Sequence, residues 1–111
     1  MAKIDTYRDI IENIITEYAS VPYTNSPLET FTVFDRKNDH YMMMIMGHEN
    51  NAWVHACIIH ICIKNNKCWL MRDNTDAVIA DELLLEGVPA TDIVIGFQPE
   101  YRRHLTGLAI N

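Results

Sequence analysis

The sequence predicts one α+β domain over residues 1–111, in which two helices pack on a mostly antiparallel sheet. Three observations lead to this prediction. An amphipathic helix pattern opens the chain, several strand-length segments follow it, and a second helix pattern with its own start and stop signals comes late. A length of 111 residues suits a single compact domain with a modest core.

The first helix is predicted over residues 4–18, where apolar residues recur every three or four positions. Asp5 lies in the expected first turn, where a carboxylate suits the helix dipole. Pro22 is expected to end the helix, because the residue before a proline is pushed out of the α region. The apolar stripe consists of Tyr7, Ile10, Ile11, Ile14, Ile15 and Tyr18.

Two strands are predicted next, over residues 29–35 and 40–47. The first alternates in character, with Phe31 and Val33 expected on one face and Phe34 on the other. The second, HYMMMIMG, is apolar throughout and has the length of a strand. The polar segment 35–39, DRKND, is the turn between them.

The segment from Trp53 to Asp73 is predicted to be a long hairpin with a two-residue turn at Asn65-Asn66. Asparagine tolerates the positive φ that a type I′ turn requires, so this dipeptide is a hairpin signal. Placing the turn there fixes the register of the two strands. The expected pairs are Lys64–Lys67, Ile63–Cys68, Cys62–Trp69, Ile61–Leu70 and His60–Met71.

Strand alternation divides this hairpin into two faces, and both contain apolar side chains. The face expected to lie under the helices holds Ile59, Ile61, Ile63, Cys68 and Leu70. The second face holds Ile58, His60, Cys62, Trp69 and Met71. With only two substantial helices available, this mixed face is expected to stay uncovered and to mediate contact with another protein or self-association.

The C-terminal third is predicted to contain a helix over residues 76–86, capped by Asn74 or Thr75 and ended by Gly87. A short strand over 93–96, a helical turn over 99–104 and a final short strand over 105–110 are expected after it.

Composition restricts the classes of function. The formal net charge is −6, which disfavours direct nucleic-acid binding, because the overall field repels phosphate. No apolar run approaches the ~20 residues of a membrane helix, and the first residues lack a signal-peptide core. Three cysteines form no disulfide framework, so reduced thiols and a cytoplasmic location are expected.

Four potential zinc ligands occur within eight residues, namely His55, Cys57, His60 and Cys62. On a regular strand the first two and the last two face opposite ways, which excludes one tetrahedral site within a chain. Only a site shared across a two-fold axis stays conceivable. We therefore expect no metal and no cofactor.

Catalytic residues are also not indicated by the sequence. Nothing near Cys62 would lower a thiol pKa, although His60 lies on the same face. Asp73 and Asp76 bracket a helix start, where acids serve as caps. We therefore expect that the protein is not an enzyme. The alternative is a small hydrolase or nuclease-associated enzyme that uses His60 together with Asp73 and Asp76.

Many short motifs follow one another along nearly the whole chain. The N-terminal motifs are Tyr7-Arg8, Ile10-Ile11, Glu17-Tyr18-Ala19 and Val21-Pro22-Tyr23. The central motifs are Asp39-His40-Tyr41, His60-Ile61, Ile63-Lys64, Lys67 and Trp69. The C-terminal motifs are Gly87-Val88-Pro89, Asp92-Ile93-Val94 and Gly96-Phe97. In their order and spacing these motifs resemble the XisI family, the fdxN element excision controlling factors of cyanobacteria. The chain departs from the family pattern near Trp53 and at His48, Cys62, Met71 and Gln98, which makes its mixed face more apolar.

The resemblance implies a regulatory protein in DNA rearrangement during heterocyst development, which would act beside a recombinase and a companion protein, XisH. It also implies a domain that self-associates, most simply as a dimer. The candidate interaction residues are Ile58, His60, Cys62, Trp69, Met71, Arg102 and Arg103.

Overall fold

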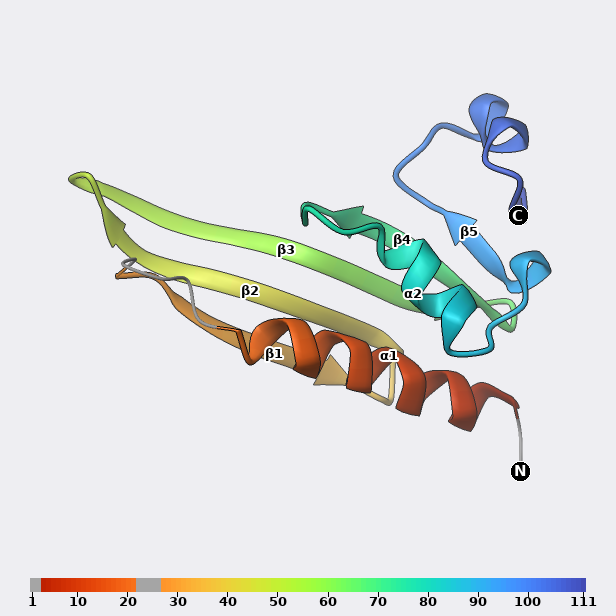
Figure 1. The fold of residues 1–111 in the computed structure, drawn as a ribbon, viewed down its shortest axis with the longest axis horizontal. Coiled ribbons are helices and arrows are strands. Elements are labelled where there is room, and N and C mark those ends of the chain that lie inside the picture. The colour runs from red at the N-terminus through yellow and green to blue at the C-terminus, as the bar shows by residue number, and fades with distance from the viewer. Residues whose placement is uncertain (1–2, 22–26) are drawn as a thin grey trace.

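The computed structural model describes residues 3–21 and 27–111 (Figure 1). The predicted helix stop at Pro22 and most of the loop after it lie outside these residues. The helices and strands are α1 Lys3–Ala19, β1 Glu29–Asp35, β2 His40–Glu49, β3 Ala52–Lys64, β4 Lys67–Asp73, α2 Ile79–Leu85 and β5 Ile93–Ile95. Two 3-10 turns, η1 Ala90–Asp92 and η2 Glu100–Leu105, flank β5 and the segment after it.

The strands form one five-stranded sheet in the order β1-β2-β3-β4-β5. The first three pairings are antiparallel, and only β4 and β5 run parallel. Both α-helices lie in front of the sheet in Figure 1, α1 over β1 and β2 and α2 beside β4. The predicted α+β class and the mostly antiparallel sheet are confirmed.

The main core lies between the helices and this face of the sheet. Helix α1 spans the predicted residues with one more at each end, and it buries Tyr7, Ile11, Ile14 and Ile15. The central strands bury alternate residues on the same side, which is the period-2 pattern of a half-covered sheet. The buried strand residues of this core include Tyr41, Met43, Ile59, Ile61 and Leu70.

Asparagine and aspartate residues determine the tight turns. Asn65 and Asn66 have φ values of +52° and +63°, as a type I′ turn requires, and the predicted turn is confirmed. In the β1–β2 turn Asp39 has φ +58°, a conformation in which aspartate is enriched. The Asp35 carboxylate accepts hydrogen bonds from the backbone N–H groups of Lys37 and Asn38 and closes that turn.

The predicted hairpin register is correct for four of its five pairs and wrong for the last. His60 pairs with Arg72, whereas Ile61 pairs with Leu70, so Met71 is an extra residue in β4. This irregularity is a β-bulge, in which two residues on one strand oppose one on the other. A strict alternation pattern cannot include it.

A second bulge lies in β3 and corrects the predicted face of Ile58. Met43 pairs with Ile59 and Met44 pairs with Cys57, which leaves Ile58 without a partner in β2. As a result Ile58 and Ile59 are both buried in the main core, at 5% and 0% exposure. Ile58 therefore does not belong to the mixed face.

Helix α2 begins at Ile79, three residues later than predicted, and the expected caps Asn74 and Thr75 do not cap it. The cap comes from Asp73, whose Oδ2 accepts a hydrogen bond from the Ile79 N–H at 2.9 Å. The helix ends as predicted before Gly87, which has φ +106°.

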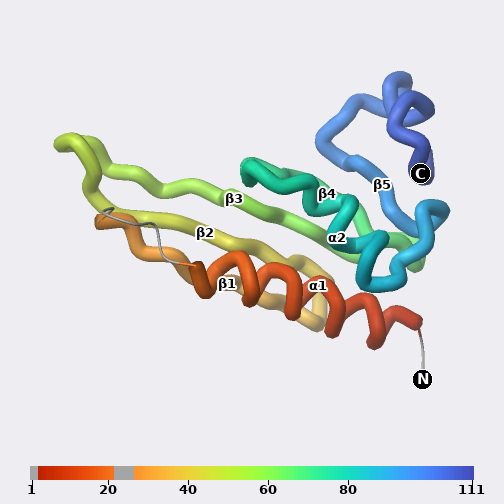
Figure 2. Tube along the Cα trace, in the orientation of Figure 1, coloured from red at the N-terminus to blue at the C-terminus, as the bar shows by residue number. Residues whose placement is uncertain are grey.

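The C-terminal segment lies beyond β4 and β5 (Figure 2), and it packs on the side of β4 that faces away from the helices. Strand β5 and the helical turn η2 occur where a strand and a turn were predicted. The predicted strand over 105–110 is wrong, because only a single bridge, from Val94 to Ala109, is formed there. Cys62, Trp69 and Val94 form a second small core, against which Ala109 packs. Within residues 3–21 and 27–111, no helix is long and apolar enough to cross a membrane.

Candidate partner-binding face

Over β1, β2 and β3, the face of the sheet away from the helices presents a row of large apolar side chains. Strand β2 buries Tyr41, Met43 and Ile45 under α1, so the alternate residues of that strand point the other way. Their register partners in β1 and β3 point the same way. We define the open face as Phe31, Val33, Met42, Met44, Met46, Trp53, His55, Cys57 and His60.

None of these nine side chains belongs to either hydrophobic core. The three methionines and Phe31 are half-buried, whereas Val33 is 38% and Trp53 is 59% exposed. No helix of the described chain lies over them, since α1 and α2 both pack on the far side. Methionine and aromatic side chains are enriched in protein interfaces, and methionine adapts to irregular surfaces.

The β2–β3 hairpin carries an aromatic group at its far end, where it extends beyond α1 (Figure 1). The Trp53 ring lies 5.0 Å from the His48 ring and 6.5 Å from the His55 ring, measured between centroids. An exposed tryptophan between two imidazoles offers a rigid amphipathic contact surface.

At the other end of the open face, two histidines on neighbouring strands touch. His40 Nδ1 lies 3.1 Å from His60 Nε2. Burial, and then the nearby charge of His40, lowers the pKa of His60 below its ordinary value. The lowered pKa favours the neutral form of the His60 imidazole.

Lys3 and Arg8 of α1 and Arg36 of the β1–β2 turn form ion pairs with acids on the helix side of the molecule. Arg36 bonds to Asp9 at 2.8 Å and to Glu12 at 2.6 Å. Lys3 bonds to Asp92 at 3.0 Å, and Arg8 is paired in the same way. The open face itself contains no lysine or arginine, which makes it a poor surface for phosphate.

Only some residues of the predicted mixed face lie together on the surface of the structure. Ile58 lies in the main core. Cys62 and Trp69 are buried beneath the C-terminal segment, at 2% and 8% exposure, and the Trp69 Nε1–H donates to the Lys64 carbonyl at 3.2 Å. Segments distant in sequence cover these residues, which alternation along the hairpin cannot reveal.

The other predicted residues lie near the open face or outside it. His60 is part of it, and Met71 packs on the second core. Arg103 lies over the Trp69 ring, 5.2 Å from its centroid, and donates to the Gln98 carbonyl at 3.1 Å. Arg102 is exposed on η2.

The contact residues predicted from the sequence do not include Phe31, Val33, Met42, Met44 or Met46. The signal was present in the HYMMMIMG run. A strand that is apolar on both faces needs two covers, and the chain provides helices for only one side.

The bulge at Ile58 also corrects the expected orientation of the four potential zinc ligands. His55, Cys57, His60 and Cys62 all project from the same side of β3. They are nevertheless spread along the strand over roughly 20 Å, at about 3.3 Å per residue. In the described parts of the chain, no three His, Cys, Asp or Glu side chains are grouped to hold a metal ion.

The hydrolase alternative required His60 close to Asp73 and Asp76, and the structure does not bring them together. Asp73 caps α2 on the helix side, and Asp76 is exposed in the preceding loop. Burial also raises the pKa of the Cys62 thiol, which keeps it protonated.

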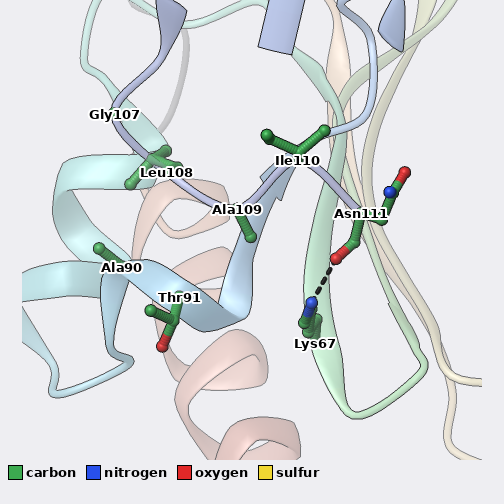
Figure 3. A pocket seen from close by; sticks show the side chains of 8 residues that line it. All are labelled: Lys67, Ala90, Thr91, Gly107, Leu108, Ala109, Ile110 and Asn111. Carbon is green, nitrogen blue, oxygen red and sulfur yellow. Dashed lines mark hydrogen bonds between the residues drawn. The ribbon is translucent and has the colours of Figure 1, made fainter. Parts of the chain in front are cut away.

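A pocket of about 510 Å³ lies against the C-terminal segment (Figure 3). The Lys67 ammonium donates to the backbone carbonyl of Asn111 across it. Its lining residues are Lys67, Ala90, Thr91, Gly107, Leu108, Ala109, Ile110 and Asn111. This lining provides no acid, histidine or thiol for catalysis.

Fold and surface together define a small α+β domain whose mixed sheet is covered by helices on one side and, over β1, β2 and β3, has no covering helix on the other. The chain matches the family model of the XisI protein over residues 1–110 and belongs to the XisI family. No curated protein sequence matches it.

Two solved structures from Anabaena variabilis ATCC 29413 share this fold. A XisI-like protein is 33% identical, with a TM-score of 0.90 over 96% of this chain and 97% of that one. The fdxN element excision controlling factor XisI is 32% identical, with a TM-score of 0.87 over 99% of this chain and all of that one. The similarity extends over whole chains, which supports the predicted family and fold.

Proposed function

We propose that this chain is a non-catalytic regulatory subunit in a site-specific DNA rearrangement, and that it acts by binding an XisH-like protein through the open face. The family membership and the controlling factor among its structural relatives support the regulatory role. The main support for the proposed binding site is the row of apolar side chains over β1, β2 and β3, which no helix of the described chain covers.

The composition of the open face favours a protein over DNA as the partner. Its centre is formed by Phe31, Met42 and Met44, which are half-buried and uncharged. A partner that buries them gains about 25 cal/mol for each Å² of apolar surface removed from water. DNA would instead need cations in this position, and the net charge of −6 opposes its approach.

The test is binding of the purified chain to the XisH-like protein of the same genome, measured by biolayer interferometry. Met44→Glu places a carboxylate at the centre of the open face. Leu85→Glu is the matched control, because Leu85 is 79% exposed on α2, on the opposite side. We expect the wild-type chain and Leu85→Glu to bind equally, and Met44→Glu to lose binding.

Size-exclusion chromatography with light scattering separates this outcome from self-association. A wild-type dimer that Met44→Glu converts to a monomer, without binding to the XisH-like protein, would assign the open face to a second copy of the chain. Equal binding by Met44→Glu and the wild-type chain would place the interface elsewhere.

A further inference from the structure

We infer that His40 and His60 form a binding site for a divalent transition-metal ion of the zinc, nickel or copper group at the edge of the open face. Their facing nitrogens, His40 Nδ1 and His60 Nε2, are 3.1 Å apart. A metal about 2.0–2.1 Å from each nitrogen, with an N–metal–N angle between about 90° and 109°, requires a separation of roughly 2.9–3.4 Å. The two donor atoms are therefore already at the spacing of a chelate.

The backbone holds this pair in place before any metal arrives. His40 is the first residue of β2 and is the register partner of Cys62, and His60 lies two residues earlier on β3. The two imidazoles are thus diagonal neighbours on one face of an antiparallel pair, within reach of each other. Their rings are 5.3 Å apart between centroids and tilted by 45°.

The two bulges provide an independent observation, because both lie beside His60. Ile58 is the extra residue on the side of β2, and Met71 is the extra residue on the side of β4. Bulges re-aim side chains and are over-represented next to functional sites. One bulge in β3, two residues before His60, and one in β4, next to its partner Arg72, point to a role for the direction of the His60 side chain.

The neighbouring charged groups leave the histidine nitrogens available. The Asp35 carboxylate, on the register partner of His40 in β1, accepts hydrogen bonds from Lys37 and Asn38 within its own turn. Arg72, the register partner of His60 in β4, is turned away and donates to the Cys57 carbonyl at 2.6 Å. No carboxylate in the described chain is bonded to either imidazole.

The chemistry of binding needs one rearrangement. In the hydrogen-bonded pair, one facing nitrogen carries a proton and donates a hydrogen bond to the other. Metal binding requires this proton to move to the other nitrogen of the same ring, so that both facing nitrogens offer lone pairs. Water completes the coordination, because two histidines fill only two positions. With two protein ligands instead of four, the site binds the ion more weakly than a structural zinc site does.

The test uses the untagged full chain, titrated with ZnCl2 by isothermal calorimetry. The bound position is read from the imidazole ¹⁵N shifts in long-range ¹H–¹⁵N NMR spectra. We expect one ion per chain, with the ¹⁵N shift changes at His40 Nδ1 and His60 Nε2. The His40→Ala and His60→Ala variants should each lose at least about tenfold in affinity.

His55→Ala is the matched control, since His55 is exposed on the same face and the same strand but its ring contacts Trp53 instead of a histidine. Its affinity should stay within about twofold of the wild type. Far-UV circular dichroism checks folding. If His60→Ala does not fold, the affinity of His40→Ala is the test, because His40 is exposed and its substitution should leave the fold intact. Undiminished affinity in His40→Ala, an equal loss in His55→Ala, or no binding at millimolar ZnCl2 would overturn the proposal.

Discussion

Arg8 of α1 donates two hydrogen bonds to the Asp39 carboxylate of the β1–β2 turn, from Nε to Oδ1 at 2.8 Å and from Nη2 to Oδ2 at 3.1 Å. The same carboxylate accepts the Tyr41 hydroxyl at 2.8 Å. This fork fixes the position of α1 over the start of β2, and it does so from the turn in which Asp39 has φ +58°. Bonding from Arg8 lowers the pKa of Asp39.

Substitution of Asp39 is therefore expected to lower the melting temperature. Asp39→Asn retains an acceptor and tolerates positive φ, but it loses the charge that Arg8 pairs with. Asp39→Ala loses both and is expected to melt lower still. Circular dichroism melts of the two variants measure this order. Asp76→Asn, an exposed acid in a loop, serves as the control and should melt like the wild type. A melting temperature for Asp39→Ala equal to that of the wild type would contradict the anchoring role.

The second prediction concerns pH and Asp92, a buried acid at the end of η1, just before β5. Its Oδ2 accepts hydrogen bonds from the Tyr7 hydroxyl and from Lys3 Nζ. The Tyr7 hydrogen bond, and then Lys3, lowers the pKa of Asp92. A folded-state pKa below the unfolded value of about 3.9 contributes stability above that value, which is lost as the pH falls through the folded pKa.

Urea midpoints should accordingly decrease as the pH falls from about 5 to below about 3. Tyr7→Phe should reduce stability by about 1–3 kcal/mol at neutral pH, because the buried carboxylate loses one of its two partners. Tyr7→Phe should also make the urea midpoint depend less on pH in this acidic range. If the midpoint of Tyr7→Phe falls as steeply with pH as that of the wild type, other carboxylates cause the loss of stability.

The third prediction separates the two faces of the sheet by stability. Ile58→Ala removes a side chain from the main core and should cost about 2–5 kcal/mol. Met44→Ala, on the open face, should cost about 1 kcal/mol or less, because its side chain belongs to neither core. Urea unfolding of both variants measures the difference. Similar losses at the two positions would contradict the assignment of the faces.

The same two positions show what the sequence could predict and what it could not. The helix α1, the Asn65-Asn66 turn and the four pairs nearest that turn follow from local rules of periodicity and turn chemistry. The bulge at Ile58 does not, because a period-2 pattern assumes unbroken pairing, and adjacent isoleucines fit either face. The Ile58-Ile59 doublet, which interrupts an otherwise alternating strand, is the local sequence signal of this bulge.

Other differences arise from contacts between residues distant in sequence or from unusual local bonding. Asp73 caps α2 from six residues before its start, which the usual spacing of a capping residue does not anticipate. Trp69 is covered by Val94 and Ala109, far along the chain. The predicted contact surface consequently moves from Trp69 toward Met44 and its neighbours on β1, β2 and β3.

The fourth prediction uses the two tryptophans to read the open face directly. Trp53 is 59% exposed at the end of the β2–β3 hairpin, whereas Trp69 is 8% exposed beneath the C-terminal segment. A Trp69→Phe chain therefore reports on Trp53 alone, and a Trp53→Phe chain reports on Trp69 alone. Acrylamide should quench the first several-fold more strongly than the second, because collisional quenching requires access to the ring.

If a protein partner binds over the open face, it should reduce quenching of Trp53 and leave that of Trp69 unchanged. Protection of Trp69 alone on binding would place the contact on the C-terminal segment instead, near Arg102 and Arg103.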